Sequence, residues 1–143
     1  MEKVNLLDKD RDDYVKKEIA ELASKTAHKK LAIWAIDCAE HVLSYFEEKY
    51  YKDNRPRKAL EAGRLWVRDR MPVNEVRSAA FASHDAARAT EGIASAVARA
   101  AGHAAATAHV SRHAVHAANY AAITPKERIW QYKHLLNLRN RRH

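Results

Sequence analysis

Apolar residues recur along this chain with the spacing of one helix face. The first stripe, Val15, Ile19 and Leu22, follows a group of aspartates whose negative charge complements the positive end of a helix. The residues before those aspartates show no such pattern. We therefore expect a flexible N-terminal lead-in at residues 1–9 and a single helical domain over residues 10–143.

Four breaks in the pattern divide the rest of the chain into helices. Pro56 and Pro125 are typical of a first helical turn, and Thr124-Pro125-Lys126-Glu127 has the form of a capping box. Met71-Pro72 and Thr90-Glu91-Gly92 indicate turns. The helices predicted after the first stripe cover about residues 27–50, 56–69, 73–89 and 93–122, and a last one begins at residue 125.

Composition supports this interpretation. Only three Gly and three Pro occur in 143 residues, and Ala, the strongest helix former, is abundant. We expect an all-α, single-domain bundle of five to six helices around a central Ala- and His-rich helix. No apolar run is long enough for a membrane span, and the one cysteine, Cys38, excludes a disulfide within the chain. A cytoplasmic location with no membrane contact is the expectation.

Charge is distributed unevenly along the chain. Residues 1–48 hold eight Lys/Arg and eleven Asp/Glu, a balance of −3, whereas residues 49–143 hold eighteen and seven, a balance of +11. Such asymmetry is typical of a surface for an anionic partner, nucleic acid included, and equally of helix faces covered by solvated Arg and Lys. No named DNA- or RNA-reading motif accompanies it.

Two predicted helices carry facing charge stripes. The stripe on the second helix is mainly acidic, and the stripe on the third is mainly basic. Neighbouring antiparallel helices commonly pair such stripes, so we expect ion pairs between them rather than acid–base catalysis. The same surface is the candidate partner-binding site, with Asp37, Glu40, His41, Arg55, Arg57, Glu61, Arg64 and Arg68 as its members.

Histidines supply the other candidate chemistry. His109, His113 and His116 follow i, i+4, i+7 spacing and share one face of the predicted helix over 93–122, with Tyr120 continuing the row. Such a row can bind zinc or another transition metal, but no carboxylate lies between Glu91 and Glu127. Packed or hydrogen-bonded histidines are therefore the preferred interpretation, with no cofactor expected.

Two further histidines do not complete a site. His103 falls on a different, small-residue face of the same predicted helix, where a structural role is expected. His84-Asp85 has the dipeptide of the HD phosphohydrolases, but that metal set needs a further downstream aspartate, and Asp85 is the last one in the chain.

Several ordered blocks of sequence resemble one known family. The matching blocks are Leu31 to Leu43, Phe46-Glu47, Asp53, Arg55-Pro56-Arg57, Ala59 to Ala62, Arg64, Trp66, Arg68, Ala100 to Ala104, Ala106 to Val110, His113-Ala114, Tyr120-Ala121, Glu127-Arg128, Trp130-Gln131 and His134-Leu135. Together they cover most of residues 31–139 and resemble the immunity-protein-five-like family of bacterial polymorphic toxin systems.

The resemblance implies a protein that binds and neutralises a cognate toxin. It brings no catalytic residues, so we expect a protein that is not an enzyme. Departures lie at helix ends: Ser44-Tyr45 stands where Leu-Pro is expected, and the turn Arg68-Asp69-Arg70 lacks the expected Gly.

Two other functions remain open from the sequence. One is a metal-binding or metal-dependent hydrolytic helical bundle using the histidine row. The other is a basic nucleic-acid-binding helical protein, whose affinity would fall steeply with salt.

Overall fold

The computed structural model describes residues 2–141, with side-chain environments from residue 9 on, and every regular element in that part of the chain is a helix. The predicted all-α class is confirmed, but five to six helices is too few. The helices are α1 (Glu2–Ala23), α2 (His28–His41), α3 (Ser44–Glu47), α4 (Arg55–Val67), α5 (Val73–Arg88), α6 (Gly92–Ala106), α7 (His113–Ala121) and α8 (Pro125–Asn140).

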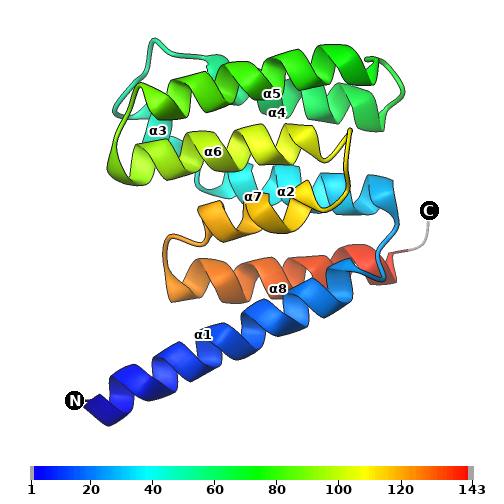
Figure 1. Ribbon diagram of the computed structural model, residues 1–143. Coiled ribbons are helices and arrows are strands. Elements are labelled where there is room, and N and C mark those ends of the chain that lie inside the picture. The colour runs from blue at the N-terminus through cyan, green and yellow to red at the C-terminus, as the bar shows by residue number, and fades with distance from the viewer. Residues whose placement is uncertain (1, 142–143) are drawn as a thin grey trace.

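The helices form successive layers (Figure 1). α4 and α5 lie side by side at one end, α6 packs beneath them, α2 and α7 follow, and α8 lies below α7. α1 crosses α8 obliquely at the opposite end. α2 contacts α4, α6, α7 and α8, so it connects both ends of the bundle.

Alanine builds the centre of the bundle. Eight residues of the fifteen-residue α6 are buried, seven of them Ala or Gly, and this helix contacts α2, α3, α4, α5 and α7. Small side chains let helix backbones approach closely and cost little side-chain entropy on burial. The predicted central Ala-rich helix is thus present as α6, while the large core side chains Trp34, Phe46 and Ile36 come from α2 and α3.

The predicted helix over residues 93–122 is wrong in one respect, because it is two helices. α6 ends at Ala106 and α7 starts at His113. At the break, the Thr107 hydroxyl donates to the His103 carbonyl at 3.1 Å. The Thr107 carbonyl is occupied by the His28 ring nitrogen at 2.5 Å. With that carbonyl used by another helix, the chain turns through i→i−3 hydrogen bonds and α7 returns against α6.

The predicted helix over residues 27–50 is also interrupted, at Val42 and Leu43. Their N–H groups donate three residues back, to the carbonyls of Ala39 and Glu40. Both side chains are buried, with 0% and 2% exposed. Neither Gly nor Pro marks this break in the sequence; burial of two consecutive apolar side chains accompanies it.

α4 ends in a Schellman motif. The Arg70 N–H donates to the Leu65 carbonyl at 2.8 Å, and the Asp69 N–H donates to the Trp66 carbonyl at 2.9 Å. Asp69 takes the left-handed conformation that this motif requires, with φ of 59°. The Gly that the resemblance leads us to expect in this turn adopts this conformation without strain, and Asp is among the few other residues that adopt it readily.

The predicted start of the last helix is confirmed at Pro125. The Thr124 side chain accepts a hydrogen bond from the Glu127 N–H at 3.2 Å. The Glu127 carboxylate does not complete the reciprocal half of the capping box within the described structure, because it bonds the His41 ring at 2.6 Å instead. Glu127 therefore links α8 to α2.

Replacing Thr124 with Ala is expected to lower the free energy of unfolding by about 1 kcal/mol, because the N–H of Glu127 loses its capping acceptor. Urea denaturation measures this loss. Thr124→Ser is the matched control, since it retains the hydroxyl oxygen and should stay close to the original stability. Equal losses in both variants would show that the cap contributes nothing.

α1 begins at Glu2, so residues 2–9 of the predicted lead-in lie within this helix; their flexibility and the domain limit at residue 10 remain predictions. Met1 lies outside the described residues. None of the helices in the described part of the chain is both long and apolar enough to cross a bilayer.

Candidate functional site

Ion pairs join α2 and α4, as the charge stripes predict. One guanidinium nitrogen of Arg64 donates to Asp37 at 2.8 Å and to Glu40 at 3.0 Å. Burial by itself lowers the pKa of Arg64, but its hydrogen bonds to the two carboxylates outweigh this and hold the pKa above its ordinary value. The acidic and basic stripes therefore meet at a partly buried, fixed cation.

The other predicted members of this surface lie around that contact. Arg57 forms a two-bond fork with Glu47 at 2.6 Å, and those hydrogen bonds lower the pKa of Glu47. Arg55, the first residue of α4, forms a similar fork with Asp53 of the preceding loop, at 2.9 and 2.7 Å. Glu61 is exposed on α4, and Arg68 is exposed directly after the end of that helix.

α8 contributes three residues that the sequence-based site did not include. His134 bonds the Asp37 carboxylate through Nε2 at 2.7 Å, and His41 bonds Glu127 through Nδ1 at 2.6 Å. Trp130 stacks on His41, with ring centroids 3.8 Å apart and planes 4° apart, and on His134 at 4.8 Å and 20°. The three residues are Glu127, Trp130 and His134. Their i, i+3, i+7 spacing is the signal in the sequence, because it places them on one face of α8.

These contacts form an open pocket between α2 and α8, which we call the α2–α8 pocket. Its volume is about 390 Å³, and it is lined by Asp37, Glu40, His41, Trp130 and His134. Each imidazole is oriented by a carboxylate, and the ring stack holds both in place. The arrangement presents fixed hydrogen-bonding groups beside an aromatic surface, which suits recognition of a polar side chain.

Cys38 does not add a nucleophile to this pocket. Its side chain is only 1% exposed, within the core. Burial raises the pKa of the thiol well above its usual range, and the nearby Asp37 carboxylate raises it further. Both observations indicate an unreactive thiol.

The structure does not place His109, His113 and His116 in one row on a single helix, as the sequence predicted. His109 lies in the exposed turn between α6 and α7, whereas His113 and His116 lie on α7. The helix break folds α7 back so that His103 Nδ1 lies 3.0 Å from His113 Nδ1. The prediction that His103 is separate from His113 and His116 is therefore wrong, because it assumed a continuous helix.

His84, His103, His113 and His116 form what we call the histidine cluster. The ring centroid of His103 lies 4.8, 5.2 and 5.4 Å from those of His84, His113 and His116. Tyr120 stacks on His103 at 5.4 Å. Burial, followed by the repulsion of neighbouring cationic groups, lowers the pKa of His103 to about 4.

Close packing holds the cluster together. A Cβ added to Gly102 would lie 2.7 to 2.9 Å from atoms of the His84 ring, so this glycine makes room for the imidazole. Within the described residues, no group of three or more His, Cys, Asp or Glu is arranged to hold a metal ion. Metal binding by His109, His113 and His116 thus stays a prediction without a geometric basis in this part of the chain.

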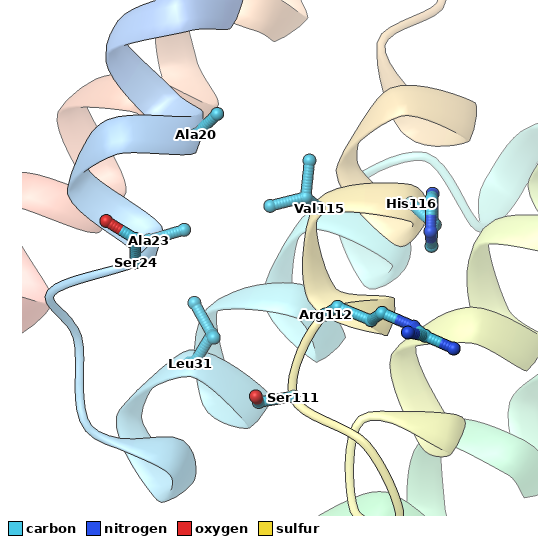
Figure 2. A pocket seen from close by; sticks show the side chains of 8 residues that line it. All are labelled: Ala20, Ala23, Ser24, Leu31, Ser111, Arg112, Val115 and His116. Atoms are coloured by element: carbon cyan, nitrogen blue, oxygen red, sulfur yellow. The ribbon is translucent and has the colours of Figure 1, made fainter.

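A second pocket lies between α1 and α7 (Figure 2). Its volume is about 360 Å³, and its walls are mainly apolar. Val115 points toward α1, whereas Arg112 and His116 extend to the other side of α7. The lining residues are Ala20, Ala23, Ser24, Leu31, Ser111, Arg112, Val115 and His116. This pocket lacks the fixed, oriented polar groups of the α2–α8 pocket.

Comparison with known proteins identifies a family. The family model described as Imm-5 like putative immunity protein matches residues 21–138, which is most of the chain. The chain belongs to this immunity-protein family. No curated protein and no solved structure matches it. The family segment includes α2 to α7 and nearly all of α8, hence the ion pairs, the α2–α8 pocket and the histidine cluster, while most of α1 precedes it.

Proposed function

We propose that this immunity-family protein protects the cell that makes it by binding a cognate toxin of a polymorphic toxin system, with no catalysis of its own. The family match over residues 21–138 carries the proposal. The binding surface that we propose is the charged face of α2 and α4, extended by the α2–α8 pocket. The encounter is expected in the cytoplasm.

The geometry of this face suits protein recognition. Arg57 and Arg64 are held by carboxylates on a neighbouring element, so little side-chain freedom remains to be lost when a partner binds. Charges fixed in place also steer a complementary partner and exclude others. Zinc binding and nucleic-acid binding remain alternatives for which the described geometry offers no further support.

Co-expression with the toxin candidate encoded beside this gene tests the proposal. We expect the protein to restore growth and to elute with the toxin in size-exclusion chromatography. Arg57→Asp, within the face, should weaken the complex by about tenfold or more, because it reverses a charge that faces the partner. Arg77→Asp, an exposed arginine of α5 outside the face, is the matched control and should bind normally.

Failure to restore growth together with failure to form a complex contradicts the proposal. Rescue without any complex contradicts the direct-binding mechanism. Equal effects of the two arginine variants contradict the placement of the binding face on α2 and α4.

A further inference from the structure

The α2–α8 pocket offers more hydrogen-bond acceptors than donors. Arg64 bonds only the Oε1 atom of Glu40, and no described residue donates to the Oε2 atom. His41 and His134 each use one ring nitrogen to bond a carboxylate. When these imidazoles are neutral, that nitrogen carries the proton, and the other nitrogen carries a lone pair. The pocket therefore presents the Oε2 atom of Glu40 as an acceptor and, on neutral imidazoles, one ring nitrogen each of His41 and His134.

The rings beside these acceptors add a flat aromatic surface. The 3.8 Å stack of His41 on Trp130 and the 4.8 Å stack of Trp130 on His134 fix three rings in one column. The His41 side chain at one end of this column remains 42% exposed. A planar cation binds such a surface through stacking and through attraction to the ring faces.

The local charge is negative although the protein is positive overall. Three carboxylates, those of Asp37, Glu40 and Glu127, lie in or beside the pocket, and Arg64 is the fixed cation that bonds two of them. The net charge of the whole chain is +8. Beyond about 10 Å the surrounding positive charge is screened by salt, so a cation near the pocket responds mainly to these carboxylates.

We propose that the α2–α8 pocket receives the guanidinium group of an arginine on the partner protein. A guanidinium has five N–H donors in one plane, which match acceptors spread around a stacked aromatic column. An ammonium group has a compact charge and no planar face that could stack on the rings. An anion would be repelled by the Oε2 atom of Glu40, to which no described residue donates. This inference rests on the proposed function for the identity of the partner.

Small probes test the pocket directly. In NMR titrations of the full chain, Nα-acetyl-arginine amide is expected to shift the Trp130 indole and the His41 and His134 ring signals in a saturable way. Nα-acetyl-citrulline amide has nearly the same shape but a neutral end group, and it should bind about tenfold more weakly or worse. Equal binding of the two probes, or no shift at these three residues, overturns the proposal.

A pair of variants shows whether Glu40 supplies the acceptor. Glu40→Gln removes the charge in the pocket and should weaken arginine binding by about tenfold. Glu75→Gln removes one negative charge from an exposed site on α5 and is the matched control. Circular dichroism confirms that both variants fold. An undiminished affinity in Glu40→Gln, or an equal loss in the control, contradicts the proposal.

The toxin complex separates this inference from the proposed function. If a complex forms, Glu40→Gln should weaken it by about tenfold relative to Glu75→Gln. A complex that is indifferent to Glu40→Gln overturns the arginine inference and leaves the proposed function intact. Arginine binding in the absence of any complex supports the chemistry assigned to the pocket and contradicts the proposed function.

Discussion

Trp34→Ala is expected to lower the free energy of unfolding by about 3–5 kcal/mol, well beyond the loss from removing the Thr124 cap. Trp34 is 0% exposed, and its indole N–H donates to the Gln131 carbonyl at 2.8 Å. The side chain of Gln131 in turn donates to the Ala118 carbonyl at 2.9 Å. Trp34 thus joins α2 to α8, and Gln131 joins α8 to α7, so removal of the indole leaves a large cavity and breaks the first of these two links.

Chemical denaturation followed by circular dichroism measures this loss. Trp34→Phe is the matched control, because it keeps much of the buried aromatic volume and removes the N–H donor and the rest of the indole. It should lose clearly less stability than the alanine variant. A loss below about 1 kcal/mol for Trp34→Ala would show that the described packing around α2 is wrong.

Acid is expected to destabilise the protein through the histidine cluster. An unfolded histidine has a pKa near 6.5, whereas burial and neighbouring cations hold the pKa of folded His103 at about 4. Between these values the unfolded chain binds a proton that the folded chain does not. The stabilisation is therefore complete above pH 6.5 and is lost as the pH falls toward 4. Because His103 is partly exposed, we expect acid to lower the free energy of unfolding through this residue by about 1–2 kcal/mol.

His103→Gln should flatten this dependence. The unfolding free energy of the original protein and of the variant is measured at several pH values between 7 and 4, and the difference between the two curves isolates His103 from the carboxylates. His109→Gln is the matched control, because His109 is exposed in the turn. Parallel curves for the original protein and His103→Gln would refute the assignment.

Two neighbours of His103, His84 and His113, also have lowered pKa values, so acid destabilises the folded protein through them as well. Burial lowers the pKa of His84 and of His113, and Arg99, Arg88 and Arg112 add repulsion at these two positions. Asp85 is the acidic group that opposes this at His84. Protonation of several rings in one cluster is therefore unfavourable, and the loss in acid should exceed that from His103 alone.

Local sequence patterns predicted the class and most helix positions. Helix starts marked by proline, as at Pro125, and turns marked by Met71-Pro72 were found where the pattern placed them. The breaks at Val42 and Thr107 were missed because long-range contacts accompany them: burial of Val42 and Leu43 in the core at the first, and the bond from His28 at the second. Such contacts leave no local signal.

The candidate site, too, was predictable only where it depends on local sequence patterns. Charge stripes on two consecutive helices predicted the contact of Arg64 with Asp37 and Glu40. The contribution of α8 to the site could not be derived from those stripes, because it depends on how a helix nearly a hundred residues later in the chain packs against α2. The histidine cluster was missed for a similar reason, since its geometry depends on the direction in which α7 leaves the turn.

The alanine-built centre has a consequence for how this protein can diversify. Ala100, Ala101, Ala104 and Ala105 are no more than 1% exposed, so any larger side chain there must push helices apart. The outer faces of α4 and α8 carry no such restriction. Under the proposed function, exposed charges on these faces can therefore be substituted while the interior stays fixed, so that new specificities arise without a new fold.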